Sequence, residues 1–304
     1  GTWSGINAAS LSMIMGDRKQ AETLARTVIR LSAERWKQSA QREYWTLATA
    51  AEANLLLGRQ ETAAKYYAFA KVHCTNSYSS LASSRRQLAL LARYLPVDAA
   101  VMDTLRIPPV AAFSGHLIDA PGQKPPRFPE SAAEPVRRRI ADVLDRLGIR
   151  IGYASAACGA DVLFHECLRE RGGECNVVLP FDRGEFLKTS VSFAGESWVH
   201  RVERVLAESA AVEQATRGGY GGVDHLFSYA NRLILGKAML RSRSLETEPL
   251  LIVVWDGKRN GAPGGTAECI ETWKRSGFPI VASDPVNASE THVATAATPK
   301  AAAS

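Results

Sequence analysis

The stretch that decides the fold of this chain is Leu250-Leu-Ile-Val-Val-Trp-Asp-Gly257, followed by Ala262-Pro-Gly-Gly-Thr-Ala-Glu268. Its apolar, β-branched run predicts a strand that is buried on both faces. A short polar loop then leads into Gly264-Gly265-Thr266, where a helical pattern begins. Glycines let the backbone approach an anion closely, and the free N–H groups of a helix N-terminus face it. The stretch therefore predicts a strand, a glycine loop and a helix that bind a phosphate.

Strand and helix patterns alternate around this stretch, from residue 107 to residue 283. Short apolar runs predict strands at 110–113, 149–154, 176–180, 211–215, 250–255 and 279–282. Amphipathic stretches predict helices at 132–147, 160–171, 198–210, 224–241 and 266–276. Such alternation is typical of an α/β domain with a doubly wound parallel sheet.

Residues 1–106 read as a helical domain, because they are rich in helix-forming residues and contain no proline before Pro96. Two segments resemble each other, each with a helix, a glycine turn (Gly16 or Gly58) and a second helix, and a third helical element follows at 79–94. The small residues Ala8, Ala9, Ala48 and Ala51 are expected to let the paired helices approach closely. The pattern ends at Ile107-Pro108-Pro109, since a residue before proline avoids the helical conformation.

Composition limits the classes of protein to which the chain can belong. The 304 residues carry a net charge of +6, but the basic residues are dispersed, so an anionic small ligand explains the charge as well as DNA does. No apolar stretch is long enough to span a bilayer, and the first residues do not resemble a signal peptide but a cut inside a longer protein. The five cysteines form no Cys-x-x-Cys pair, which indicates free thiols in the cytoplasm. Residues 284–304, rich in Ala, Ser, Thr and Pro, are expected to form a disordered linker.

Candidate site residues follow the predicted strands, because open parallel sheets bind ligands outside the carboxyl ends of their strands. We expect the ligand-binding residues to be Ser114, Gly115, His116, Gly159, Ala160, Asp161, Arg183, Gly264, Gly265, Thr266 and Glu268. Tyr220 lies in Gly218-Gly-Tyr-Gly-Gly222 and is the candidate for a mobile flap. The residues themselves predict no catalytic residue, metal ligand or cofactor.

Several of these residues have a second interpretation. His116 contacts the ligand or is bonded to the backbone of a turn, and Asp161 meets a ribose hydroxyl or caps its helix. Arg183 faces a phosphate or is solvated. Cys158 is expected to be a packing residue, since neither a neighbouring histidine nor metal-ligand spacing accompanies it. Trp255 and Trp273 could stack on a base, but core packing is the default for both.

Ser114-Gly115, Gly159-Ala160-Asp161 with Glu166, and Pro263-Gly264-Gly265-Thr266 with Glu268 resemble motifs of the SLOG superfamily. This resemblance covers residues 107–283. It implies a Rossmann-like domain related to the Lonely guy phosphoribohydrolases and to DNA-processing protein A.

The helical segments are similar to divergent tetratricopeptide repeats, in particular to bacterial relatives of the TRAFs-binding region of MAP kinase kinase kinases. The combination of the two domains resembles bacterial signalling proteins, some of which carry an adenylate or guanylate cyclase domain downstream. The resemblance implies that the repeats contact a protein partner.

The hydrolase subgroup of the superfamily has the pattern Pro-Gly-Gly-x-Gly-Thr-x-x-Glu. Here Thr266 follows Gly265 directly, so the acid/base spacing of that subgroup is absent. A cradle without this spacing suits binding better than turnover. The sequence therefore favours a regulatory module that senses a nucleotide or a nucleotide derivative. The alternatives are a nucleoside-monophosphate phosphoribohydrolase or NAD-type glycohydrolase, with Glu166, Glu268 and Arg183 as candidates, and, last, a single-stranded DNA-binding protein. These alternatives include both a binding module and an enzyme, and the oligomeric state is left open.

Overall fold

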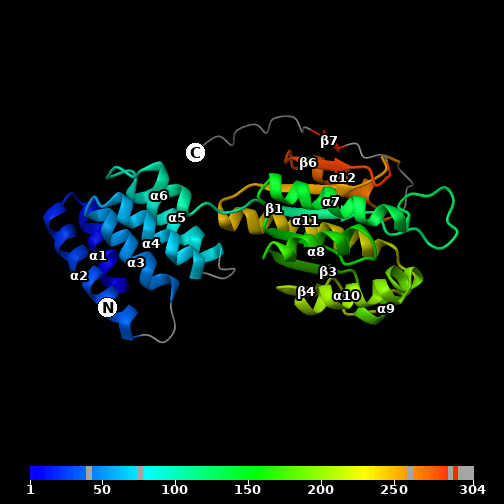
Figure 1. The fold of residues 1–304 in the computed structure, drawn as a ribbon, viewed down its shortest axis with the longest axis horizontal. Coiled ribbons are helices and arrows are strands. Elements are labelled where there is room, and N and C mark those ends of the chain that lie inside the picture. Colours follow the sequence, from blue (N-terminus) through cyan, green and yellow to red (C-terminus); the bar gives the residue numbers. More distant parts are fainter. Residues whose placement is uncertain (39–42, 74–77, 259–262, 287–289, 294–304) are drawn as a thin grey trace. The chain divides into compact units, whose positions relative to one another are not determined.

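The computed structural model describes residues 1–38, 43–73, 78–258, 263–286 and 290–293 (Figure 1). It divides the chain into two compact units, residues 1–107 and residues 108–304. We describe each unit by itself. The division falls within Ile107-Pro108-Pro109, where the sequence pattern changes.

The N-terminal unit is built of helices that pack on one another. They are α1 (Thr2–Ile14), α2 (Arg18–Gln38), α3 (Tyr44–Leu56), α4 (Gln60–His73), α5 (Tyr78–Leu91) and α6 (Ala99–Thr104). Helix α1 packs against α2, and α3 packs against α4, so each pair forms a helical hairpin. Of the four alanines expected at the helix contacts, Ala9, Ala48 and Ala51 are buried, but Ala8 is exposed because it lies on the outer face of α1.

Both hairpins turn by the same backbone motif. Gly16 and Gly58 have φ angles of +86° and +74°, which L side chains rarely adopt. After the first helix, Asp17 N–H donates to Ser12 O and Gly16 N–H to Met13 O; after the third, Arg59 and Gly58 bond in the same way to Asn54 and Leu55. This is the hydrogen-bond pattern of a Schellman motif, which satisfies the last carbonyls of a helix.

The C-terminal unit is an α/β domain around one sheet. Its strands are β1 (Val110–Gly115), β2 (Ile151–Ala154), β3 (Glu174–Leu179), β4 (Ala211–Gln214), β5 (Pro249–Val254), β6 (Ile280–Ser283) and β7 (Glu290–Val293). In the described part of the chain they lie in the order β4-β3-β2-β1-β5-β6-β7. The first six of these pair in parallel, and β7 pairs antiparallel with β6.

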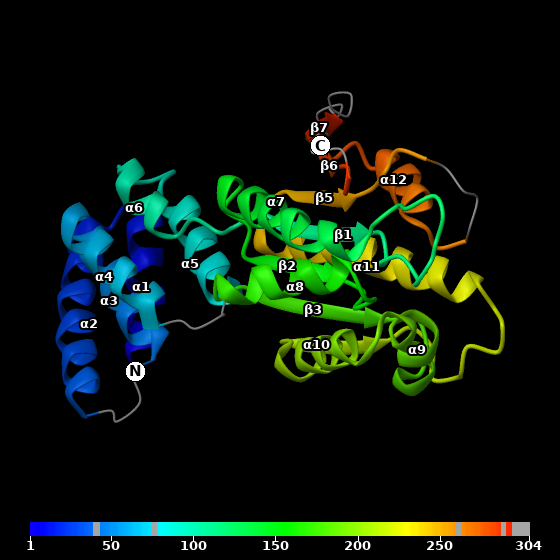
Figure 2. The same ribbon diagram turned by 45° about the vertical axis from the view of Figure 1, so that its right-hand side comes forward.

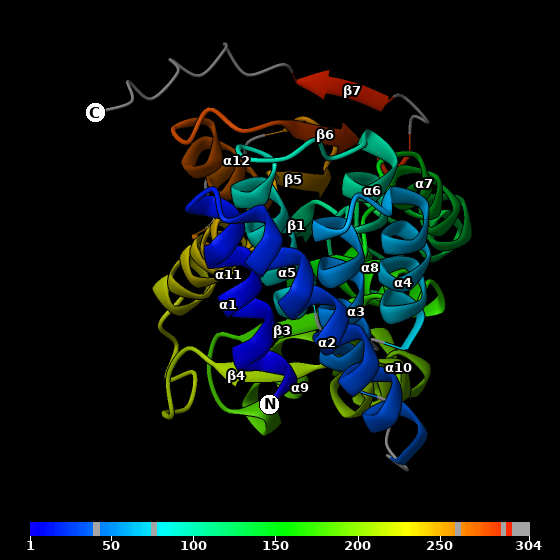
Figure 3. The same ribbon diagram turned by 90° about the vertical axis from the view of Figure 1, so that its left-hand side faces the viewer.

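Helices cover both faces of this sheet, as Figures 2 and 3 show for α7, α8 and α10 on one face and α11 and α12 on the other. The helices are α7 (Ala133–Arg146), α8 (Ala160–Glu170), α9 (Arg183–Ser190), α10 (Glu196–Glu208), α11 (His225–Leu245) and α12 (Thr266–Lys274), with short 3-10 turns at Glu130–Ala132 and Ser192–Ala194. Every residue of β3 and β5 is buried, because both faces of these central strands are covered.

The strand order changes direction at β1, which creates a crevice at the carboxyl ends of the strands. The chain runs from β1 through β2 and β3 to β4 on one side of β1, and then continues with β5 and β6 on the other side. Loops that leave β1 and β5 therefore diverge to opposite faces, and the crevice between them is where open α/β sheets bind ligands. Ser114 and Gly115 of β1 pair with Val253 and Val254 of β5 at this crevice.

The structure differs from the sequence-based expectation in two elements. Residues 183–190, for which the sequence predicted neither a helix nor a strand, form α9, whose N-terminus is capped by the Asp182 carboxylate through the N–H groups of Gly184 and Glu185. Within the predicted linker 284–304, residues Glu290–Val293 form β7, which hydrogen-bonds along β6. Edge pairing needs only backbone groups, so composition gave no signal for it. The rest of that segment beyond Val286 lies outside the described residues.

In the part of the chain that the structure describes, none of the helices combines the length and the apolar character needed to cross a membrane.

Candidate functional site

A cavity of about 350 Å³ lies at the carboxyl ends of β1, β2, β3 and β5. Its walls come from the loops after these strands, from α9, and from the N-terminal parts of α11 and α12. They include Ser114, Gly115, His116, Arg127, Ser155, Asp161, Phe186, Thr189, Ser190, Asp224, Phe227, Asn231, Trp255, Gly264, Gly265 and Thr266. Its volume lies within the range of small-molecule sites.

The structure brings seven of the eleven predicted ligand-binding residues together in the wall of this cavity. They are Ser114, Gly115, His116, Asp161, Gly264, Gly265 and Thr266. Ser114 and Thr266 are 152 positions apart in the chain, yet Ser114 Oγ lies 3.3 Å from Thr266 Oγ1. The ends of β1 and the start of α12 therefore form one surface.

Gly159 and Ala160, which were predicted to bind ligand, are not part of the cavity wall. They join two loops instead: Ala160 N–H donates to His116 O, and Gly159 forms an isolated bridge with Leu117. A Cβ atom on Gly115 would come within 2.4 Å of the Ala160 Cβ atom, so this pair lets α8 pack tightly against the end of β1.

Asp161 is a buried carboxylate at the edge of the cavity, 7% exposed. It accepts a hydrogen bond from the Ala157 N–H, at 3.3 Å, and so fixes the loop that follows β2. Burial raises the pKa of Asp161 to about 7, against which the backbone hydrogen bonds act only in part. Near neutral pH this side chain can therefore accept or donate a proton or a hydrogen bond inside the cavity.

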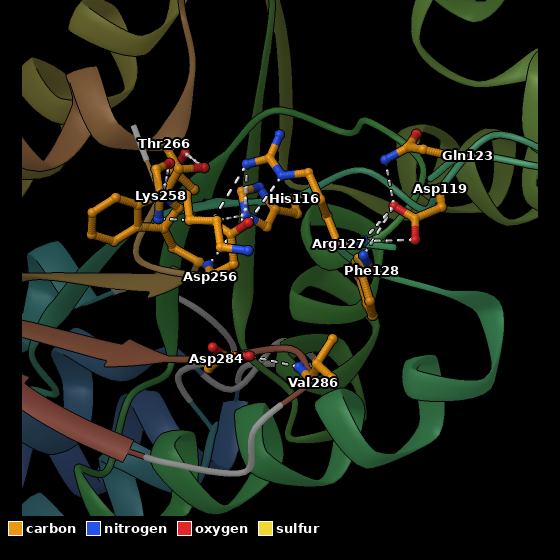
Figure 4. A network of polar contacts seen from close by, with 12 residues as sticks. His116, Asp119, Gln123, Arg127, Phe128, Asp256, Lys258, Thr266, Asp284 and Val286 are labelled. Atoms are coloured by element: carbon orange, nitrogen blue, oxygen red, sulfur yellow. Dashed lines mark hydrogen bonds and ion pairs between the residues drawn. The ribbon is translucent and has the colours of Figure 1, made fainter. Parts of the chain in front are cut away.

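His116, Arg127 and Asp256 form a polar network at the mouth of the crevice (Figure 4). Arg127 Nε donates to Asp256 Oδ2 over 3.0 Å, and Arg127 Nη2 lies 3.1 Å from His116 Nε2. The Asp256 N–H also donates to His116 Nε2, over 3.2 Å. Nε2 can accept from these two N–H groups when the imidazole is neutral and its proton is on Nδ1.

The electrostatics of the network agree with this assignment. Burial, aided by the Arg127 charge, lowers the pKa of His116. Burial alone would raise the pKa of Asp256, but hydrogen bonds from Arg127 and from the Lys258 N–H hold it well below its ordinary value. His116 Nε2 also lies 3.1 Å from Asp256 Oδ1, a contact that becomes an ion pair only when the ring is protonated. At neutral pH the network is thus one Arg–Asp ion pair beside a neutral histidine.

The loop that carries Arg127 was not among the segments expected to bind a ligand, and Arg127 itself was missed. Asp119 holds this loop by accepting the N–H groups of Arg127 and Phe128, at 2.9 and 3.0 Å (Figure 4). Phe128 is fully buried. The sequence does contain a signal here, because Arg127 follows Asp119 in the same loop and stands directly before the aromatic Phe128. The partner of Arg127, Asp256, is however 129 positions away.

The glycine loop before α12 is held by packing as well as by hydrogen bonds. Gly264 has a φ of +75°, and a Cβ atom there would lie 2.2 Å from Phe227 Cβ. Its N–H donates to Glu268 Oε2 over 2.7 Å, and its carbonyl accepts from Asn231 Nδ2 over 2.7 Å. Gly264 is therefore required by the contact with α11. Residues 259–262, which include the start of the predicted loop, lie outside the described residues.

Glu268, predicted to bind ligand, points back to its own helix start. Its Oε2 atom accepts from Gly264 N–H and from Ser228 Oγ, both over 2.7 Å. These hydrogen bonds outweigh burial and lower the pKa of this carboxyl group. Glu268 is not part of the cavity wall but fixes the backbone of the residues that are, Gly264 to Thr266.

Three further candidates lie away from the cavity wall. Arg183 forms an ion pair with Glu203 over 3.6 Å at the surface, with about half of its side chain exposed. Glu166 is bound by Arg201 through two hydrogen bonds of 2.9 and 2.6 Å. Trp273 is fully buried and donates to Pro279 O, as expected of a core residue. None of these side chains is available to a ligand in the cavity.

Tyr220, the candidate flap residue, lies in an aromatic cluster beside the cavity. Its ring centroid is 5.2 Å from that of Phe181 and 5.8 Å from that of Phe227, and its hydroxyl donates to Asp224. Phe227 and Asp224 belong to the cavity wall. Tyr220 therefore contacts residues of the cavity wall but does not line the cavity itself. Its role as a mobile flap stays a prediction.

The polar side of the cavity that the sequence did not reveal comes from α9. Its last two residues, Thr189 and Ser190, face the cavity together with Ser155 and Asn231. An Asp182 followed three positions later by Glu185 is a helix-start signal that could have identified α9. Among the described residues no cluster of three or more His, Cys, Asp or Glu side chains could hold a metal ion.

No protein-family model matches this chain, and comparison with curated proteins finds no relative. What the cavity binds must therefore be argued from its geometry.

Proposed function

We propose that the C-terminal unit binds a nucleotide or a nucleotide-derived ligand in the cavity between β1 and β5, as the sensing part of a signalling protein. The observation that carries the proposal is the position of the α12 N-terminus. Gly265 and Thr266 lie in the cavity wall where β5 turns into α12, directly beside the end of β1. A helix start at this position offers its N–H groups to an anionic group.

The cavity wall also carries groups with complementary chemistry. Asp161, Asp224 and the hydroxyls of Ser155, Thr189 and Ser190 line the cavity and can accept hydrogen bonds from a ligand. A ligand that combines an anionic group with sugar hydroxyls or base N–H groups satisfies these groups and the α12 N-terminus together, and phosphorylated nucleosides have this composition. Phe227 and Trp255 add apolar surface to the wall.

The site is better suited to binding a ligand than to hydrolysing it with the residues that a hydrolase would use. The three candidates for that role, Arg183, Glu166 and Glu268, are engaged with other residues and do not face the cavity. Most basic side chains of this unit are likewise paired, for example Arg171 with Asp145 and Arg241 with Glu174, which disfavours a nucleic-acid surface.

Asp161 favours a second candidate function, a glycohydrolase. A carboxyl group with a pKa of about 7 that faces a cavity can protonate a departing base or stabilise a developing positive charge at a ribose carbon. Incubating the protein with AMP and NAD, followed by chromatography, tests this function. Release of the free base that Asp161→Asn abolishes would establish it.

Binding is tested by calorimetric titration with AMP, ADP and NAD, and with adenosine as the ligand without a phosphate. We expect saturable binding of a phosphorylated compound and at least tenfold weaker binding of its nucleoside, because the nucleoside leaves the α12 N-terminus without an anion. Equal affinity for both, or no binding of any phosphorylated compound, would contradict the proposal.

Gly265→Asp is the matched variant. Gly265 is the N-cap residue of α12 with an extended backbone, φ −73° and ψ 162°, and aspartate is a favoured residue at that position. The variant should fold, yet its carboxylate repels the ligand phosphate and occupies the N–H groups. Gly236→Asp serves as the control, since a side chain at Gly236 meets open space and Gly236 does not face the cavity.

We further propose that the unit is a Rossmann-like domain of the SLOG kind and that the helical hairpins are divergent tetratricopeptide repeats that contact a protein partner. The equal turns at Gly16 and Gly58 support the repeats. The strand order about β1 supports the Rossmann-like interpretation.

A further inference from the structure

The helical unit has a cavity of its own, of about 300 Å³, between α2, α3 and α4. It lies entirely within residues 1–107, so it is separate from the nucleotide site that we propose. Its walls are mostly apolar, but five of its side chains carry polar groups: Ser32, Trp36, Lys37, Thr46 and Tyr66.

Ser32 is the feature of this cavity that indicates a ligand. The residue is 2% exposed, and its Oγ atom has no hydrogen-bond partner within the described residues. A serine inside a helix ordinarily bonds to a carbonyl of the preceding turn, and a buried hydroxyl without any partner is rare. A hydroxyl that lines a cavity and lacks a protein partner can find one on a molecule in that cavity.

Aromatic rings form the open side of the cavity. Trp36 and Phe69 meet edge to face, with their ring centroids 6.0 Å apart, and Phe69 is 45% exposed. Tyr66 lies on α4 one turn before Phe69 and also lines the cavity. Rings in this arrangement offer flat apolar surface to a planar ligand.

The charge at the rim is positive. On α2, Arg30 pairs with Glu34 and Arg35 pairs with Glu43, whereas Lys37 forms no ion pair among the residues that the structure describes. Its ammonium group is thus the uncompensated charge beside the cavity, and it complements a carboxylate. Lys37 follows Ser32 by five residues, a rise of about 7.5 Å along the helix.

We propose that this cavity binds a small aromatic carboxylic acid whose ring carries an N–H or O–H group. The ring lies against Trp36 and Phe69, its polar group bonds to Ser32 Oγ, and its carboxylate faces Lys37. The helical unit would then give the protein a second chemical input besides its nucleotide site.

The test is calorimetric titration of the full chain with three related probes. Indole-3-acetate has both polar ends, indole-3-acetamide lacks the negative charge, and naphthalene-1-acetate lacks the ring N–H. We expect saturable binding of indole-3-acetate and about tenfold weaker binding of each of the other two. Absence of saturable binding by indole-3-acetate, or equal affinity for all three probes, overturns the proposal.

Two variants test which side chain binds each polar end of the acid. Ser32→Ala should bind indole-3-acetate and naphthalene-1-acetate equally, because the N–H has lost its acceptor. Lys37→Glu should weaken indole-3-acetate about fivefold or more and leave indole-3-acetamide unchanged, since only the acid faces the new charge. Lys19→Glu makes the same charge change at the other, exposed end of α2 and should have no effect. If Ser32→Ala and Lys37→Glu both bind the three probes like the unmodified chain, the acid does not occupy this cavity and the proposal fails.

Circular dichroism and AMP titration of each variant show whether the rest of the molecule is intact. Because AMP is expected in the other unit, its binding is unaffected by success or failure here.

Discussion

At the scale of single residues, Gly264 and Asp161 show how one position can serve both packing and chemistry. Gly264 lies in the cavity wall, but its positive φ and its contact with Phe227 make glycine necessary even without a ligand. Asp161 fixes the loop after β2 through Ala157 and at the same time faces the cavity. Both roles can be separated by substitution.

We predict that Gly264→Ala destabilises the C-terminal unit by roughly 3 kcal/mol, because the left-handed backbone costs about 1–2 kcal/mol and the overlap with Phe227 adds to it. Gly257→Ala is the matched control, since Gly257 also has a positive φ of +78° but its Cβ would meet open space. Urea unfolding measures both. Equal losses in the two variants would show that the contact with Phe227 is unimportant.

Asp161 should make stability depend on pH. Its pKa rises from 3.8 to about 7 on folding, so the folded state holds a proton that the unfolded state has lost between these values. The protein therefore loses stability as the pH rises from about 4 to about 7. Asp161→Asn should not show this loss. Its free energy of unfolding should therefore rise by about 4 kcal/mol relative to that of the unmodified protein over that range.

His165 acts with the opposite sign in the same window. Burial lowers its pKa to about 4, so protonation of the unfolded state reduces stability as the pH falls below 6.5. The effects of Asp161 and His165 on stability partly cancel. The free energy of unfolding should therefore depend less on pH in the unmodified protein than in Asp161→Asn. Denaturant titrations between pH 4 and pH 8 give both curves. Parallel curves would contradict the pKa of Asp161.

At the scale of elements, the loop from Leu117 to Pro129 matters most, because it carries Arg127 across the crevice to Asp256. Sequence composition indicated a loop but gave no hint of its conformation. That conformation is set by Asp119, whose carboxylate gathers two backbone N–H groups and the Gln123 amide.

We predict that Asp119→Ala accelerates amide hydrogen exchange at Arg127 and Phe128 by about tenfold or more, because both N–H groups lose their acceptor. Gln123→Ala removes a neighbouring side chain but leaves these two bonds in place, and it should preserve their protection. Hydrogen exchange read by NMR separates the variants. If Asp119→Ala exchanges like the unmodified protein, the loop is held by Phe128 alone.

At the scale of the whole molecule, the α/β unit has its own hydrophobic core, which extends over residues between Ala111 and Val281. The helical unit buries a separate set that includes Ala51, Leu55, Tyr67, Leu88 and Leu91. Each unit therefore contains the apolar burial that folding needs.

We expect a chain cut between residues 107 and 108 to yield a C-terminal unit that unfolds at the same urea concentration as in the full chain and binds AMP with the same affinity. Two separately measured unfolding curves and one titration check this. A C-terminal unit that unfolds at lower urea or loses affinity would show that the helices stabilise it.

The sequence by itself determined the kinds and order of most elements. Its apolar periodicity separated a helical part from an alternating part, and its glycines marked the turns at Gly16, Gly58 and Gly264. These signals are local, because side chains one to four positions apart share a face of a strand or a helix. Helix α9 and strand β7 escaped this kind of reasoning, although a capping signal for α9 was present.

The tertiary structure alone decided which loops meet. The order β4-β3-β2-β1-β5-β6 brings Ser114 beside Thr266, and it sets Arg127 against Asp256 and His116. It also turned Glu268 and Arg183 away from the cavity, where sequence spacing had grouped them with it. The pairs Ser114–Thr266 and Arg127–Asp256 are 152 and 129 positions apart in the chain, and they depend on strand order and helix packing, which no local pattern of side chains encodes.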